Sequence, residues 1–147
     1  MQRYYQLAKL LSDKTFHIYI TGSHREGQQM KQECPEIFDL PHVFDVTGHY
    51  DLEGLIKLIE SADCLVASGT GPVHIAAAAD VLTIGLYPPT RPIHPGRWGP
   101  IGRNVITLCK GKICNDQKNK HKYMHNITSK EVYNAILYKL SGTHDKQ

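Results

Sequence analysis

The chain has 147 residues, of which 41% are hydrophobic and 21% charged, a composition typical of one globular domain and not of a disordered segment. A formal net charge of +3 is too small to indicate nucleic-acid binding, and no apolar run approaches the ~18 residues of a membrane span. No signal-peptide pattern is present, and four cysteines are too few for a disulfide scaffold, which indicates a cytoplasmic protein.

The first third of the chain predicts a helix, a strand and a second helix. Apolar residues at helical spacing predict the first helix within 1–14, and an apolar/polar alternation predicts a strand over 16–21. Ser23 is placed to cap a helix over 24–33, which carries Glu26 in its first turn. A domain of alternating strands and helices rarely opens with a helix, so we expect the strand before it to be missing.

The middle of the chain continues this alternation. A short strand is predicted over 43–46, and Asp51 can cap a helix whose apolar residues follow at helical spacing. Further strands are predicted over 82–87 and 105–108. Strands that alternate with helices predict a Rossmann-like, three-layer α/β domain over 1–147, with one mainly parallel sheet wrapped by helices.

One segment of this chain, 64–74, combines a buried strand, a glycine turn and the start of a helix. Residues 64–67 are apolar, two glycines in Ser68-Gly69-Thr70-Gly71 favour a sharp turn, and Pro72 suits the first helical position. A helix N-terminus presents free N–H groups and the positive end of the helix dipole, so this turn can bind a phosphate, with His74 within reach. The alternative is a structural turn that binds nothing.

The segment 88–100 holds five prolines and two glycines, and predicts a long rigid loop without regular structure. Ligands of parallel α/β sheets bind beyond the carboxyl ends of the strands. We therefore expect this proline loop to converge on one crevice with the turns at 22–26, 49–51 and 69–74. The loop also carries three cationic side chains that can reach a sugar or a phosphate: Arg91, His94 and Arg97.

The segment between the last strand and the terminal helix is polar and rich in lysine. A solvated loop is the simplest interpretation, and attraction to anionic lipid or to a phosphorylated acceptor is the alternative. The spacing Cys109-x4-Cys114-x6-His121-x3-His125 also raises a zinc site, but its first gap is long and no other finger feature accompanies it, so we predict no metal. A capping box, Thr128-x-x-Glu131, then starts a terminal helix, and the tail at 143–147 is expected to fray.

The central segment Ala62-Asp-Cys-Leu-Val-Ala-Ser-Gly-Thr-Gly-Pro-Val-His-Ile-Ala-Ala-Ala-Ala79 resembles the signature of the lipopolysaccharide heptosyltransferases, glycosyltransferase family 9. The stretches Leu52-Glu-Gly-Leu55 and Tyr87-Pro-Pro-Thr-Arg-Pro fit the same family. The resemblance extends over nearly the whole chain. It implies the C-terminal, donor-binding half of a two-domain GT-B enzyme, without that half's first strand.

The resemblance implies an ADP-linked sugar, typically ADP-heptose in this family, as the donor substrate, with no further cofactor. Glu26 would bind the ribose hydroxyls and Tyr50 would lie near the adenine, while Thr70, Gly71 and His74 would meet the diphosphate. One departure concerns Gly69, where the family usually has Asp, so a group expected to contact the donor or organise the turn is absent.

The resemblance further implies an N-terminal acceptor domain as a missing partner, a lipid-linked or lipopolysaccharide acceptor, and a location in the cytoplasm or at the inner membrane face. No catalytic residue can be nominated in this chain, so by itself it is expected to transfer little or no sugar.

The rival hypothesis is a non-catalytic nucleotide- or phosphate-binding regulatory module. A dinucleotide-binding domain fits less well, because His74 stands where GxGxxG has its third glycine. Without its first strand, the sheet would keep unpaired edges, which favours self-association.

Overall fold

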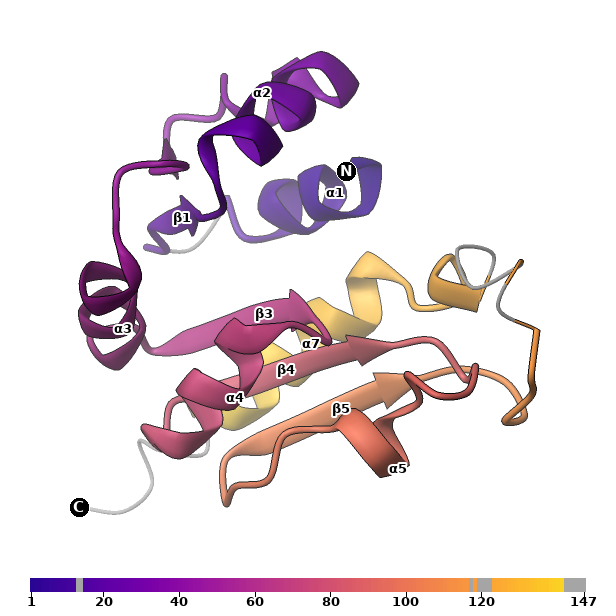
Figure 1. Cartoon of the computed structure of the whole chain (residues 1–147). Coiled ribbons are helices and arrows are strands. Elements are labelled where there is room, and N and C mark those ends of the chain that lie inside the picture. Colours follow the sequence, from indigo (N-terminus) through magenta and orange to yellow (C-terminus); the bar gives the residue numbers. More distant parts are fainter. Residues whose placement is uncertain (13–14, 117, 119–122, 142–147) are drawn as a thin grey trace. The chain divides into compact units, whose positions relative to one another are not determined.

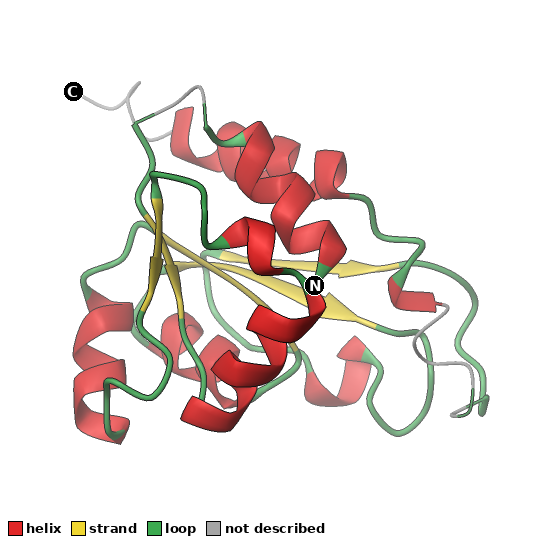
Figure 2. Cartoon of the chain, turned by 90° about the horizontal axis from the view of Figure 1, so that it is seen from above, coloured by secondary structure: helices red, strands yellow, loops and turns green. Residues whose placement is uncertain are grey.

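The computed structural model describes residues 1–12, 15–116, 118 and 123–141 (Figure 1). The chain forms two compact units, Met1–Leu55 and Ile56–Gln147, each with its own parallel strands. Helices and loops alternate with the strands along the chain, as Figure 2 shows by colour. In the described residues, no helix is both long enough and apolar enough to span a membrane.

The first unit is built on a pair of parallel strands, in which Ile18 is in register with Val43. Apolar side chains of both strands pack with the first helix and a short 3-10 helix, around the buried residues Ala8, Cys34 and Ile37. The elements are α1 (Gln2–Leu10), β1 (Ile18–Ile20), α2 (His24–Glu33), η1 (Pro35–Ile37), β2 (Val43–Asp45) and α3 (Leu52–Glu60), which crosses the boundary between the units.

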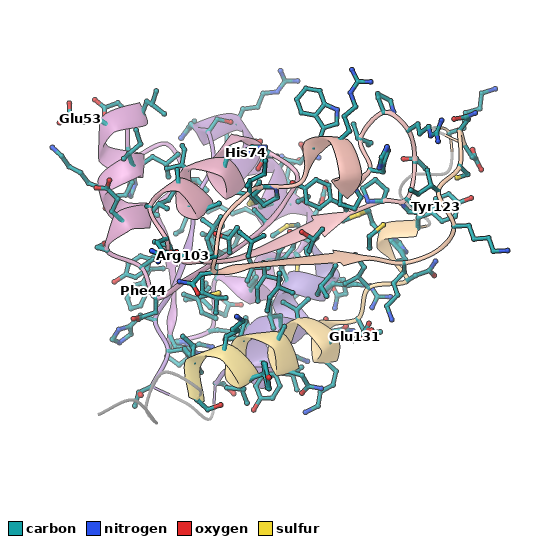
Figure 3. All side chains as sticks on the ribbon, turned by 90° about the horizontal axis from the view of Figure 1, so that it is seen from below. Phe44, Glu53, His74, Arg103, Tyr123 and Glu131 are labelled. Carbon is teal, nitrogen blue, oxygen red and sulfur yellow. The ribbon has the colours of Figure 1, made fainter. Side chains whose placement is uncertain are left out.

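The second unit is a three-stranded parallel sheet in the order β3-β4-β5. All six residues of the central strand β4 are buried, and helices α4 and α7 pack on opposite faces of the sheet (Figures 1 and 3). The elements are β3 (Cys64–Ser68), α4 (Gly71–Ala78), β4 (Leu82–Tyr87), α5 (Pro95–Trp98), β5 (Val105–Cys109) and α7 (Ser129–Ser141).

The predicted α/β class with parallel strands is confirmed, but the single sheet is not. The described strands form two sheets, β1-β2 and β3-β4-β5. That a first strand is missing stays a prediction. The assignment of 1–147 to one nucleotide-sugar-binding domain stays a prediction.

Most predicted elements lie within one or two residues of their observed bounds, because periodicity and caps are local signals. Two details were wrong. The proline loop is not wholly irregular, since it contains the helical turn α5, and Pro72 is the second residue of α4, which begins at Gly71. The expected fraying of 143–147 lies outside the described residues.

Candidate functional site

The glycine turn lies where the sequence placed it, between the end of β3 and the start of α4. The N–H of Gly69 donates to the carbonyl of Leu86 at 3.3 Å, which ties the turn to the end of β4. Thr70 is the N-cap of α4, but its side chain forms no hydrogen bond with the helix. Pro72 has no N–H and the Val73 N–H donates to the carbonyl of Thr70 at 3.2 Å, so the N–H of Gly71 is the group of this first turn that can meet an acceptor from outside.

Gly69 is required by the packing of the second unit. A Cβ at this position would lie 2.3 Å from Cε1 of Tyr87, and a Cβ at Gly85 would lie 2.7 Å from Cε2 of the same ring. The Tyr87 ring therefore occupies the space between two glycines. Its hydroxyl donates to the carbonyl of Trp98 at 2.9 Å, and burial raises the pKa of Tyr87.

These contacts explain the departure at Gly69 from the family pattern. Any side chain there would have to displace the Tyr87 ring, which is only 1% exposed. A carboxylate side chain at this position is therefore incompatible with the observed position of the Tyr87 ring.

Gly71 differs from Gly69, because no atom lies within 4 Å of the position that its Cβ would occupy. No contact within the described structure therefore requires glycine here, and the backbone at the start of α4 faces open space. His74, in the same first turn, has an exposed side chain (Figure 3). The arrangement leaves room for an anion against the backbone at Gly71, at the positive end of the α4 dipole and beside the His74 imidazole.

In the first unit, the loops after β1 and β2 are joined by hydrogen bonds. The N–H of Val46 donates to Ile20 at 3.0 Å, and the N–H of Gly48 donates to Gly22 at 2.8 Å. Gly48 has a φ of +74°, a conformation that favours glycine. The loop that leads to Glu26 and the loop that leads to Tyr50 therefore leave the same edge of this sheet.

Glu26 is exposed and forms a capping box with Ser23. Its Oε2 accepts from the N–H and the hydroxyl of Ser23, both at 2.7 Å, and the Glu26 N–H donates to that hydroxyl at 3.3 Å. These hydrogen bonds, first from the hydroxyl and then from the backbone, lower the pKa of Glu26. Glu26 is thus an ionised carboxylate with a structural role, and its other oxygen can still accept a hydroxyl.

Tyr50 is 47% exposed and precedes α3. Its ring lies against Gly54, where a Cβ would be 2.9 Å from Cδ1 of Tyr50. Asp51 caps the helix as predicted, since its carboxylate accepts from the N–H of Gly54 at 2.9 Å. The ring is therefore held on one side and accessible on the other, as an adenine neighbour would need to be.

The proline loop is anchored at both ends. Thr90 forms a parallel bridge with Cys114, and Tyr87 holds the carbonyl of Trp98. Beyond the ends of β3 and β4, this loop borders a cleft of about 420 Å³, which is described further below. The Nδ1 of His94 is buried and has no hydrogen-bond partner within the described structure.

The alternative of a zinc site that includes His121 is not tested, because His121 lies outside the described residues. Among the residues that the structure describes, no group of three or more His, Cys, Asp or Glu could hold a metal ion. The described cysteines are free thiols, and burial raises the pKa of Cys109.

The structure thus brings the predicted residues together within each unit: Glu26 and Tyr50 on loops at one sheet edge, and Gly69, Thr70, Gly71 and His74 in one turn. Convergence of all of them on one crevice stays a prediction. Sequence reasoning missed Tyr87 and Trp98. The small residues Gly69 and Gly85 beside a tyrosine were the available signal for the first.

Comparisons with known proteins identify the family. The model of the family described as "Glycosyltransferase family 9 (heptosyltransferase)" matches residues 1–128. Lipooligosaccharide heptosyltransferase 2 of Haemophilus influenzae is 29% identical, over 92% of this chain and 42% of its own length. Lipopolysaccharide heptosyltransferase 1 of Pseudomonas aeruginosa is 36% identical over 49% of this chain and 22% of its own length. The chain spans less than half the length of these relatives.

The fold is also that of solved heptosyltransferases. The structure of E. coli heptosyltransferase WaaC with ADP aligns with a TM-score of 0.72 and 23% identity, over 92% of this chain and 38% of that one. This likeness concerns the fold, and the chain again matches less than half of its neighbour.

Proposed function

We propose that this chain, which belongs to glycosyltransferase family 9, the heptosyltransferase family, binds the nucleotide-sugar donor of a two-domain GT-B enzyme. The donor is ADP-heptose, and the complete enzyme transfers its sugar to a lipopolysaccharide core acceptor. The names of the heptosyltransferases that this chain resembles support this substrate class.

The observation that carries the proposal is the open backbone at the start of α4. Gly71 faces open space, Thr70 leaves the helix without a side-chain cap, and His74 is exposed beside them. A helix N-terminus of this kind favours a phosphate through its N–H groups and its dipole. The exposed His74 imidazole can donate a hydrogen bond to a diphosphate bound there.

The remaining site residues, Glu26 and Tyr50, contact the ribose and the adenine of the nucleoside. Glu26 accepts hydrogen bonds from the ribose hydroxyls through the oxygen that Ser23 leaves available, and the accessible ring of Tyr50 lies beside the adenine. Sugar transfer needs a base on the acceptor hydroxyl and stabilisation of the departing diphosphate. This chain supplies the second of these, through α4 and His74.

The base and the acceptor site belong, in this proposal, to an N-terminal domain that is a partner of this chain. The chain alone then binds the donor without transferring the sugar. The enzyme would act in the cytoplasm, at the inner face of the membrane where a lipid-linked acceptor is accessible.

Calorimetric titration of the purified chain with ADP, UDP and GDP tests the proposal. We expect ADP to bind more tightly than UDP or GDP, and His74→Ala to weaken ADP binding roughly tenfold, the effect of one charge-assisted hydrogen bond. Lys130→Ala, an exposed cation on α7, serves as the matched control. Absence of binding by all three nucleotides, or equal binding in His74→Ala, would contradict the proposed donor site.

A further inference from the structure

The second unit has a cleft that none of the roles above uses. It has a volume of about 420 Å³ and lies beyond the carboxyl ends of β3 and β4, next to the glycine turn. Ser68 and Gly69 line one side of the cleft, so it adjoins the proposed diphosphate site directly. The other side chains that line it are apolar or aromatic, and include Leu86, Ile93, Trp98 and Met124.

The Trp98 indole gives this cleft a broad aromatic surface. It is 50% exposed, so one part of the ring system contacts the protein and the other remains accessible. The backbone that carries the indole is held in place, because the Trp98 carbonyl accepts from the Tyr87 hydroxyl at 2.9 Å. The Tyr87 ring is itself packed between Gly69 and Gly85, so this anchor of the Trp98 backbone is well packed.

The lining determines what can bind. Among the described residues, no charged side chain lines the cleft. The polar side chain of the lining that lies next to the glycine turn is the hydroxyl of Ser68. An apolar pocket with a few polar groups binds the apolar face of a ligand and orients it through those groups. A neutral sugar ring has such a face, since its axial C–H bonds lie on one side and are attracted to the negative face of an aromatic ring.

We propose that this cleft holds the sugar ring of the donor, stacked by its C–H face on Trp98. The inference rests on the proposed function, because the diphosphate at the start of α4 brings the group attached to it to this cleft. The ring's hydroxyls face the open side of the cleft, and the Ser68 hydroxyl is placed to accept or donate a hydrogen bond to one of them. Trp98 is thus a specificity-determining residue, which favours neutral sugars over charged ones.

Trp98 also provides a direct signal, because it is the chain's single tryptophan. We expect ADP-heptose to change the tryptophan emission at saturation, and ADP alone to change it much less. By calorimetry, ADP-heptose should bind roughly tenfold more tightly than ADP, the contribution of one aromatic contact and its buried area.

Variants of Trp98 separate the binding of the sugar ring from the binding of the ADP part of the donor. Trp98→Ala should abolish the difference between ADP-heptose and ADP while ADP affinity is retained, and Trp98→Phe should keep most of it. Ile101→Ala is the matched control, because Ile101 is an apolar residue in the same connection, 94% exposed and outside the cleft lining. Far-UV circular dichroism of each variant shows that the fold is intact.

The two proposals fail in different ways. If ADP binds but ADP-heptose binds no more tightly, or if its advantage survives in Trp98→Ala, the sugar site is overturned and the donor site stands. If neither compound binds, the donor site itself is overturned, and the sugar site with it.

Discussion

Glu26 has two roles that substitutions can separate. Glutamine at this position can still complete a capping box, so Glu26→Gln should leave the thermal midpoint nearly unchanged. It removes the charge that the ribose hydroxyls meet, and we expect ADP binding to weaken roughly fivefold. Glu26→Ala should also lose about 1 kcal/mol of stability with the cap. Thermal melts and calorimetry of both variants check this, and an unchanged ADP affinity in both would remove Glu26 from the site.

Asp45 makes a pH-dependent contribution to stability that is separate from binding. Partial burial raises its pKa, but hydrogen bonds from Lys31 and Thr47 outweigh this and lower the pKa to about 2. Because the folded-state pKa lies below the ordinary value of 3.8, the contribution is present above about pH 4 and is lost as the pH falls towards 2.

We therefore expect Asp45→Asn to lower the free energy of unfolding at pH 7 by at most about 2 kcal/mol, and by little at pH 2. Urea unfolding followed by circular dichroism at several pH values measures this. Asp39→Asn, which changes an exposed carboxylate of the same unit, is the control. A loss of stability in Asp45→Asn that is the same at pH 7 and at pH 2 would contradict the assignment.

At the scale of elements, the turn between β3 and α4 contains two glycines with different reasons to be there. Gly69→Ala places a Cβ against the Tyr87 ring and should destabilise the chain by about 1–3 kcal/mol, the usual effect of overpacking. The methyl group added by Gly71→Ala has no atom within 4 Å, so this substitution should preserve or slightly raise stability. The same methyl group should weaken ADP binding, because it obstructs approach to the start of α4. Melting curves and ADP titrations of the pair test both statements, and equal destabilisation by the two substitutions would refute the distinction.

The caps and the helix faces were predictable because their signals are contained in a few neighbouring residues. Thr128 and Glu131 form the predicted capping box, with hydrogen bonds of 2.9 to 3.2 Å, at the start of α7 (Figure 3). The Tyr87 ring between Gly69 and Gly85 was not predictable, since three residues meet only after two strands are paired. For the same reason the sequence missed the cleft beside Trp98.

At the scale of the whole molecule, the alternation of strands and helices predicted the α/β class with parallel strands, and the described strands form two parallel sheets. The convergence of the predicted site residues on one crevice depends on long-range packing, which local periodicity does not encode, and it stays a prediction.

The sheet edges lead to an expectation about assembly. Within the described structure, β3 is hydrogen-bonded on one side only, by β4, and four of its five residues are partly buried. An apolar edge strand is a template for pairing with another chain. We expect sedimentation velocity to show association that increases with protein concentration. A single monomeric species at every concentration would contradict this.

Binding of a diphosphate by the open backbone at the start of α4 is the central claim. Backbone amide NMR of the 16.6 kDa chain during a titration with ADP tests it most directly. The account predicts that the largest shifts include the amides of Thr70, Gly71 and Val73, with smaller changes at Glu26 and Tyr50. Saturable binding that leaves the amides of the α4 turn unshifted would contradict it.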